Sequence, residues 1–308
     1  MTQPQTTSKT TKKQRVNCSI CQYQINPDDE SAFTIFPCCI RAFQHEKLKA
    51  WRCPNCKTIH CLDIVDLDYY FAFYSNAKAQ LTWEFRFIYR NLLSQFKKHG
   101  FSKAHSLLDY GCGPNGLFVQ YLRECGFSKS YGYDPYGSLD SFGNPATLQK
   151  GSFDYISFQY VIAHIEDPKP ILSQLNNLLA PGGYIFIGTP NAANIDLNRP
   201  DIPDNYVPAH LPYQPHIYTR EALESLGIEQ GWVPVEFFDR KFDDTPWFGF
   251  NHRVYNTYVS LMDGSVDILH EPFQFRKAFS SPKFIFYATF GYWLSTHAEM
   301  NIMFRKRF

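Results

Sequence analysis

Short apolar runs and longer amphipathic segments alternate along the middle of the chain. The apolar run Ser106 to Leu108 predicts a buried strand that ends at Asp109, and the run Tyr131 to Tyr133 predicts a second strand that ends at Asp134. The residues between them, Leu117 to Cys125, predict a helix. Strand, helix and strand in this order are typical of a parallel sheet. The pattern therefore predicts an α/β fold with a Rossmann-like, doubly wound sheet.

Further elements of the same kind follow toward the C-terminus. Residues 138–150 contain few β-branched residues and give little support for a strand. The pattern after them predicts strands over 153–158 and 184–188, a helix from Pro168 that ends at Pro181 to Gly183, a helix after Thr219, and strands over 232–242 and 301–306. The α/β region is therefore expected to occupy residues 105–308.

Two segments outside this alternation are rich in aromatic residues. Apolar positions at helical spacing within residues 67–104 predict one or two helices that stop at Gly100, cover a ligand entrance and join two parts of the chain. Residues 243–298 predict a helical, aromatic-rich insertion before the last strand, interpreted as a lid, with ordinary packing or a dimer face as alternatives. A membrane-surface role is a further alternative, but no clear basic amphipathic helix supports it. Four aromatic residues ahead of the first helix either pack between the two parts or touch a ligand, namely Tyr69, Tyr70, Phe73 and Tyr74.

Cysteine usage separates the first part of the chain from the rest. Seven of the nine cysteines lie within the first 61 residues. The pairs Cys18-x-x-Cys21 and Cys53-x-x-Cys56 can each offer two thiolates from one tight turn, and two such turns complete a tetrahedral zinc site. The pattern predicts a zinc-binding module over residues 17–66.

Four nearby residues leave alternatives open, namely Cys38, Cys39, His60 and Cys61. They could form a second site or replace a ligand of the first, but buried thiols and a surface histidine are the preferred interpretation. A site closed by four cysteines has no open position for a substrate, so the zinc is expected to be structural. Residues 1–16 are polar and predict a disordered tail ahead of the module.

The loop after the first strand of the α/β region carries three glycines. Gly111, Gly113 and Gly116 let the backbone approach a ligand without a Cβ in the way. Nucleotide-like ligands bind over the carboxyl ends of parallel strands, and an acidic residue about twenty positions further along, here Asp134, accepts hydrogen bonds from a ribose diol. Asp109 precedes the loop, and its carboxylate can face a cationic ligand such as a sulfonium amino acid.

This loop, with its flanking elements, resembles the first motif of the class I S-adenosylmethionine (SAM)-dependent methyltransferases. A leucine-rich helix, Pro-Gly-Gly, an apolar strand and Thr189-Pro190-Asn191 further resemble the ubiquinone-biosynthesis type of small-molecule methyltransferase. Most members have a third strand where residues 138–150 support none. The resemblance covers about residues 105–230 and implies SAM as the cofactor. It also implies a set of cofactor-binding residues, namely Asp109, Tyr110, Gly111, Gly113, Gly116, Asp134, Pro135, Gln159 and Tyr160.

Methyl transfer to a hydroxyl needs a base, and three histidines are candidates. His164 follows the predicted strand end within one helical turn, whereas His210 and His216 lie in the polar loop 192–218. Imidazole titrates near neutrality and suits proton removal. His164 leads, although a histidine that only bonds the backbone fits its position equally well, and a cap contact fits His216. An oxygen acceptor is expected first, with sugar or polyketide C-methylation, RNA methylation and a non-catalytic binding module as alternatives.

The amino-acid composition limits the kinds of molecule that the chain is expected to bind. The formal net charge of +1 gives no overall electrostatic attraction for nucleic acid, which is therefore not expected as a partner. No apolar run reaches the roughly 20 residues of a membrane span, and the polar N-terminus shows no signal peptide, so a cytoplasmic location is expected. The aromatic residues of the expected lid over 243–298 suit a small-molecule acceptor that is partly aromatic or apolar. The sequence leaves the oligomeric state open and is compatible with a homodimer.

Overall fold

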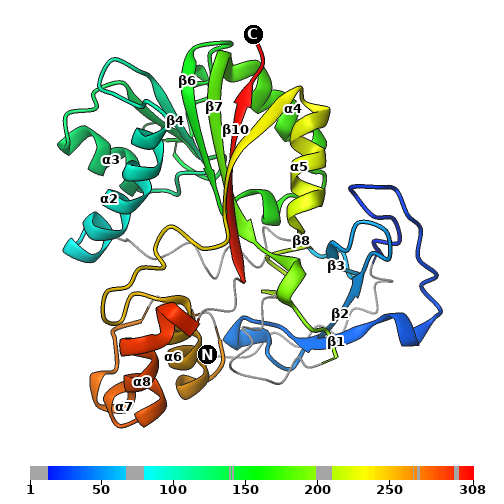
Figure 1. Cartoon of the computed structure of the whole chain (residues 1–308). Helices are drawn as coiled ribbons and strands as arrows, with labels where there is room; N and C mark the ends of the chain where they lie inside the picture. The colour runs from blue at the N-terminus through cyan, green and yellow to red at the C-terminus, as the bar shows by residue number, and fades with distance from the viewer. Residues whose placement is uncertain are drawn as a thin grey trace.

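A six-stranded sheet forms the centre of the molecule (Figure 1). The computed structural model describes residues 13–66, 80–138, 140, 142–198, 210–265, 267–268, 271–294 and 298–308, so the aromatic group at Tyr69, Tyr70, Phe73 and Tyr74 lies outside it. The sheet has the order β5-β4-β6-β7-β10-β9 and is parallel except for β10, which is antiparallel to both neighbours. Its strands are β4 (Leu107–Tyr110), β5 (Ser130–Tyr133), β6 (Phe153–Gln159), β7 (Leu179–Pro190), β9 (Trp232–Phe238) and β10 (Glu299–Lys306).

Helices cover both faces of this sheet, as Figure 1 shows, which confirms the predicted doubly wound fold. On one face lie α2 (Trp83–Lys98) and α3 (Leu117–Glu124), and on the other lie α4 (Pro168–Leu178) and α5 (Arg220–Glu229). The helix α2 buries an apolar stripe that includes Leu92, Leu93 and Phe96. It stops where Gly100 adopts a φ of +87°, as its sequence predicted.

The edge of the sheet beyond β5 has no further strand among the described residues between Asp134 and Phe153. A turn of 3-10 helix, η3 (Pro145–Thr147), stands in that stretch. The chain folds back on itself there, because the backbone N–H of Asp134 donates to the carbonyl of Phe142. The weak strand signal of residues 138–150 therefore reflects a compact loop in place of a third strand.

Two predicted boundaries in the α/β region were wrong. Pro181 to Gly183 do not end α4, which stops at Leu178 and passes directly into β7. Leu179 already pairs with Phe153, and the extra residues are accommodated by a register shift in which Gly182 has a φ of +74°. The strand β9 stops at Phe238, short of the predicted Phe242.

The N-terminal module forms a second sheet that is continuous with the α/β region. Its order is β1-β2-β3-β8. The strands are β1 (Thr34–Pro37), β2 (Lys47–Arg52), β3 (Ile59–Cys61) and β8 (His216–Ile217), with the short turns η1 (Glu30–Ala32) and η2 (Arg41–Phe43) around them. Because β8 comes from the α/β region and pairs with β3, the two parts share backbone hydrogen bonds.

The predicted tail is wrong for its last residues. Arg15 is buried, donates its backbone N–H to Leu62 and forms an ion pair with Glu166. Gln14 forms a β-bridge with Asp63. Pairing with distant residues orders this stretch, and local composition does not reveal such pairing.

The predicted insertion is helical and lies beside the carboxyl ends of the parallel strands (Figure 1). Val254, Tyr258, Phe284 and Ala288 give it a small core of its own. No helix among the described residues is long and apolar enough to cross a membrane. The insertion comprises α6 (His252–Met262), α7 (Phe275–Phe279), α8 (Pro282–Phe290) and η7 (Gly291–Leu294).

Candidate functional site

The glycine loop bends sharply at the carboxyl end of β4. Gly111 has a φ of +79°, and its N–H donates to the carbonyl of Tyr133 at 2.7 Å. A Cβ at this position would overlap the side chain of Val161, which follows β6. Only glycine satisfies both the left-handed backbone and this close approach.

Asp134 ties the glycine loop to the end of β5. Its carboxylate accepts the N–H of Gly113 at 2.8 Å and the N–H of Tyr136 at 2.9 Å. A carboxylate has about four lone-pair sites, so two acceptor positions are left after these bonds. The arrangement is compatible with a ribose diol bound across the strand tips, with the exposed Pro135 at the rim.

Asp109 lies near the carboxyl end of β4, beside Asp134, and is almost fully buried. Burial raises the pKa of its carboxyl to about 7, the nearby hydroxyl of Ser157 opposes this rise, and the nearby Asp134 adds to it. A cation placed beside this carboxyl would lower its pKa again. The site therefore suits a positively charged ligand better than a neutral one.

Two other residues expected to bind the cofactor, Tyr110 and Gln159, direct their side chains toward other parts of the protein. The ring of Tyr110 packs in the core against Tyr133 and Phe158, with centroids 5.2 Å and 5.8 Å away, so a bound cofactor would meet only its backbone. Gln159 donates from Nε2 to the carbonyl of Phe186 at 2.9 Å and thus faces the neighbouring strand.

Tyr160 has an unusual backbone at the carboxyl end of β6. Its φ is +57°, which is uncommon for a residue other than glycine and recurs at functional sites. Its N–H donates to the carbonyl of Gly188 at 2.8 Å, and the amine of Lys241 lies 4.5 Å from the centre of its ring. The tyrosine therefore faces the segment that follows β9.

A group of buried and half-buried polar residues gathers around Tyr160, and several of them carry no recognisable sequence motif. Lys241 pairs with Asp243 at 3.0 Å. Glu299 begins β10; burial raises the pKa of its carboxyl to about 7, while Lys241 and a hydrogen bond with Tyr160 act in the opposite direction. His252, the first residue of α6, has its pKa lowered to about 3 by burial and by the nearby Lys241.

The structure places two of the three candidate histidines in this polar group. Nδ1 of His164 lies 2.5 Å from the carbonyl oxygen of Tyr213, and burial lowers the pKa of this imidazole. Burial, then His164 and Lys241, lower the pKa of His210 to about 3. His164 is carried by the short turn η4 (Ile162–His164), directly after β6.

His216 lies elsewhere, at the junction of the two sheets. Its Nδ1 is 2.8 Å from Nδ1 of His60, and its Nε2 is 2.8 Å from the carbonyl oxygen of Glu166. Both ring nitrogens thus have partners within the chain. His60, expected at the surface, is fully buried by the pairing of β3 with β8.

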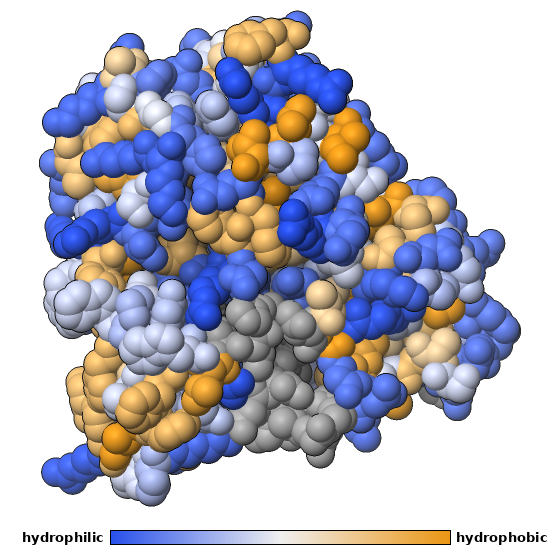
Figure 2. Space-filling model, in the orientation of Figure 1, coloured by the Kyte–Doolittle hydropathy of each residue, from blue (hydrophilic) through white to orange (hydrophobic). Residues whose placement is uncertain are grey.

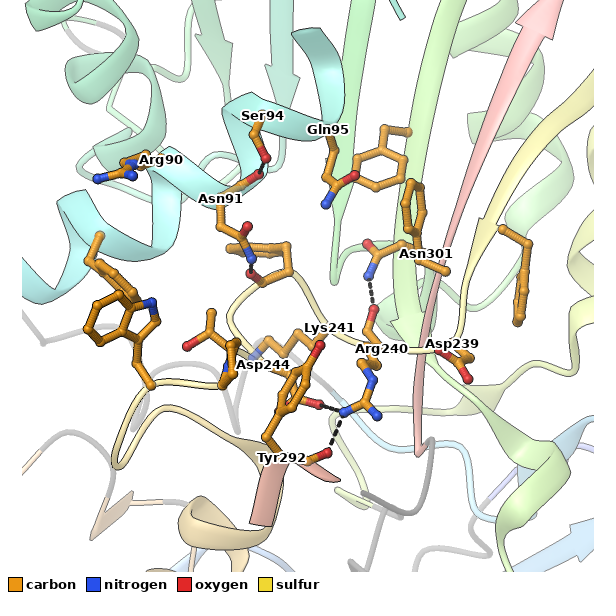
Figure 3. Close-up of a pocket in the computed structure, with 18 residues that line it drawn as sticks. Arg90, Asn91, Ser94, Gln95, Asp239, Arg240, Lys241, Asp244, Tyr292 and Asn301 are labelled. Atoms are coloured by element: carbon orange, nitrogen blue, oxygen red, sulfur yellow. Dashed lines mark hydrogen bonds and ion pairs between the residues drawn. The ribbon is translucent and has the colours of Figure 1, made fainter. Parts of the chain in front are cut away.

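A cavity of about 510 Å³ opens beside the polar group, between α2 and the segment after β9. Figure 3 shows Asn301 donating to the carbonyl of Arg240, whose guanidinium reaches both Asp244 and the carbonyl of Tyr292. Lys241 belongs to both the cavity and the polar group. Aromatic side chains that line the rest of the cavity include those of Phe87, Phe242 and Trp247. The cavity thus offers an apolar wall next to charged groups.

The four predicted zinc ligands come together where the N-terminal module packs against the start of α5, with Cys18 and Cys53 in the same core cluster as Tyr218 and Ala222. The sulfur atoms of Cys18, Cys21, Cys53 and Cys56 lie within 4.8 Å of one another, and within the described part of the chain they are the group that could hold a metal ion. Four thiols at this spacing match the ligand set of a structural zinc site. Cys38, Cys39 and Cys61 remain outside this group, as expected.

Comparison with known proteins places this fold and loop in a family. A model described as a methyltransferase domain matches residues 81–237, just over half of the 308 residues. The chain therefore belongs to this methyltransferase family, and its sheet and glycine loop are those of a class I SAM-dependent methyltransferase.

Individual relatives are distant. A ubiquinone biosynthesis O-methyltransferase of Caulobacter vibrioides is 29% identical over 152 residues, which cover 42% of this chain and 60% of that protein. One from Xanthomonas oryzae pv. oryzae is 26% identical over 130 residues, or 36% of this chain and 54% of that protein. The match thus spans less than two thirds of these relatives.

The chain is also similar to solved structures, with lower sequence identity than to the relatives above. The 1,6-didemethyltoxoflavin-N1-methyltransferase of Burkholderia thailandensis is 14% identical, with a TM-score of 0.45 over 85% of this chain and 96% of that one. A SAM-dependent methyltransferase of Archaeoglobus fulgidus is 16% identical, with a TM-score of 0.43 over 78% of this chain and 100% of that one. These similarities are too low to bear on the substrate.

Proposed function

We propose that this chain transfers the methyl group of SAM to a hydroxyl oxygen of a small molecule that is partly aromatic or apolar. The observation that carries the proposal is the position of the buried carboxyl of Asp109 at the strand tips, in the same edge of the sheet as the polar group around Tyr160. The distant ubiquinone biosynthesis O-methyltransferases support an oxygen acceptor. The aromatic wall of the cavity supports an apolar acceptor body.

The cofactor would lie across the tips of β4 and β5. The backbone at Gly111, Gly113 and Gly116 would border it, Asp134 would accept hydrogen bonds from its ribose, and Asp109 would face its positive charge. When bound, SAM supplies a methyl group that is already electrophilic on its sulfonium, and transfer joins this group to the acceptor oxygen as the carbon–sulfur bond breaks. The chain must therefore mainly align the acceptor, exclude water and remove one proton.

His164 is the favoured base. Because its Nδ1–H donates to the carbonyl of Tyr213, the imidazole lone pair lies on Nε2. Burial keeps the ring neutral near pH 7, so Nε2 can take the hydroxyl proton. His210 lies close enough to influence His164, but a pKa of about 3 makes it a weak base. His216 has both ring nitrogens engaged and is not favoured.

The four-cysteine group would hold one structural zinc ion. Four thiolates leave no open position for chemistry, so the ion would add to the stability that the module gains from its small core of Phe36, Ile40, Leu48 and Ile59. We propose the division of the chain into a metal module before residue 67, a helical segment to residue 104 and a methyltransferase domain from residue 105. The insertion over residues 243–298 would act as a cover for the acceptor.

Titration calorimetry with SAM tests the cofactor site. The full chain should bind SAM, and Asp134→Ala should abolish binding because it removes both the ribose acceptor and the anchor of Gly113. Asp28→Ala, at an exposed position of the N-terminal module, is the matched control and should bind normally. Absence of SAM binding by the unsubstituted chain would remove the proposed activity.

Transfer itself is tested with labelled SAM and a panel of phenols, catechols, sugars and RNA. Label on a phenol or catechol oxygen is expected. Label only on a sugar carbon or on RNA would refute the acceptor class while leaving the cofactor site intact.

A further inference from the structure

The helix α8 is apolar on both of its faces. Phe284 and Ala288 are buried against the rest of the insertion. On the opposite side, Ile285 is 43% exposed, Phe286 is 49% exposed and Phe290 is 50% exposed. A surface helix normally presents polar residues outward, whereas a helix that is apolar all round is normally covered. The outer side of α8 is therefore exposed, although its apolar residues are of the kind that a partner normally covers.

The neighbouring elements continue this apolar surface. On α7, the ring of Phe275 is 67% exposed and stacks on Phe279, with centroids 6.4 Å apart. Phe248 stacks on Phe279 in turn at 6.5 Å. Trp293 in η7 is 63% exposed. Figure 2 shows apolar side chains gathered at the lower left, over α7 and α8.

We call this surface the aromatic face, and its members are Phe275, Phe279, Ile285, Phe286, Phe290 and Trp293. The segment that carries it begins directly after Glu271, which pairs with Arg41, and the charges within the segment have one sign. Residues 272–294 contain Arg276, Lys277 and Lys283 but no aspartate or glutamate. The chain as a whole has nearly balanced charges, with a formal net charge of +1. A local excess of cations around exposed aromatic rings is typical of helices that lie in the interface of an anionic bilayer.

We propose that the aromatic face docks on the surface of an anionic lipid bilayer. The charge decides between this partner and a second copy of the chain, because a self-complementary contact through this face would bring the same cations of both copies together. A bilayer instead offers an apolar layer for the rings and phosphates for the lysines and arginine. Docking at the surface requires no membrane-spanning helix.

The position of the aromatic face suggests a use for docking. Tyr292, next to Trp293, lines the cavity beside Lys241, and its carbonyl accepts a hydrogen bond from Arg240. The face and the mouth of the cavity thus share η7. An apolar acceptor could pass from the bilayer into the cavity without crossing water. This last step rests on the proposed function, whereas docking does not.

Sedimentation of the full chain with vesicles tests the proposal. The chain should sediment with vesicles of phosphatidylcholine mixed with phosphatidylglycerol. A much smaller fraction of it should sediment with vesicles of phosphatidylcholine alone. The triple variant Phe275→Ser, Phe286→Ser, Phe290→Ser should bind at least about tenfold more weakly, because each removed ring takes away buried apolar area. The variant Arg276→Glu with Lys277→Glu should lose the preference for phosphatidylglycerol.

A control removes three exposed apolar side chains elsewhere. Ile35, Ile228 and Val235 are 53%, 57% and 42% exposed and lie on other elements. Replacing these three by serine should leave vesicle binding unchanged. Circular dichroism and SAM binding of each variant verify that it is folded, and they report on the proposed function separately from docking.

Three results would overturn the proposal. The first is no sedimentation of the unsubstituted chain with either vesicle. The second is equal loss of binding in the triple variant and in its control. The third is a chain that is dimeric in solution and does not bind vesicles, and whose triple variant is monomeric. That result would assign the aromatic face to a second copy of the chain.

Discussion

The close contact of Gly111 with Val161 allows a sharp test of the glycine loop. Gly111→Ala places a Cβ closer to one Val161 methyl group than real Cβ atoms approach, and 3.2 Å from the other. The backbone at φ +79° costs an L-residue about 1–2 kcal/mol. Overpacking adds about 1–3 kcal/mol. We therefore expect Gly111→Ala to lower the free energy of unfolding by about 2–5 kcal/mol.

Gly113 provides the matched control. It has a φ of +69°, but nothing lies within 4 Å of an added Cβ. Gly113→Ala should therefore cost only the backbone term, about 1–2 kcal/mol. Both variants are measured by urea unfolding, and Val161→Ala in the Gly111→Ala background should recover about 1–3 kcal/mol in a double-mutant cycle. Equal losses for the two alanine variants, or no coupling with Val161, would refute the role assigned to this contact.

Two further predictions concern the titratable groups of the site. Because burial raises the folded pKa of Asp109 to about 7, above about 3.9 in the unfolded chain, its contribution to stability is complete below about pH 4 and is lost as the pH rises through about 7. Asp109→Asn should remove up to about 4 kcal/mol of this pH dependence in unfolding experiments between pH 4 and 8. The affinity for SAM should also rise with pH more steeply than that for S-adenosylhomocysteine, which lacks the sulfonium charge, and parallel profiles would argue against a carboxylate facing the sulfonium. His164→Gln should lower kcat by about 10²–10⁴ with SAM affinity unchanged, whereas His45→Gln, at an exposed position, should have no effect; unchanged kcat in His164→Gln would assign the imidazole to the backbone contact alone.

The sequence predicted those parts of the fold that local periodicity encodes. The strands β4 and β5 and the helix α3 begin and end within one or two residues of their predicted bounds. The apolar residues that each element buries lie close together in the sequence, so the local pattern reveals them. The same reasoning failed at Pro181 to Gly183. Helix-breaking residues also fit a bulge inside a strand, and only the pairing of Leu179 with Phe153 decides between the two.

The polar group around Tyr160, on the proposed acceptor side of the site, was also harder to predict, because contacts between distant parts of the chain form it. Lys241, His252 and Glu299 belong to the segment after β9, to α6 and to β10, and they carry no spacing pattern. The fold brings them to Tyr160 through contacts between distant parts of the chain. The glycine loop, in contrast, is one contiguous motif whose geometry follows from its own residues.

If the four-cysteine group holds the proposed metal ion, the junction between the two sheets would give that ion a role beyond the stability of the N-terminal module. Thr219, the N-cap of α5, donates to the carbonyl of Cys56, and Arg15 pairs with Glu166, two residues beyond His164. Loss of the metal should loosen the turn that carries His164 while leaving the distant glycine loop in place. We therefore expect Cys53→Ser, or treatment with a chelator, to remove one metal ion per chain and to lower kcat more than SAM affinity. Cys125→Ser, at the end of α3, should change neither, and a folded, metal-free chain with full kcat would show that the two parts act independently.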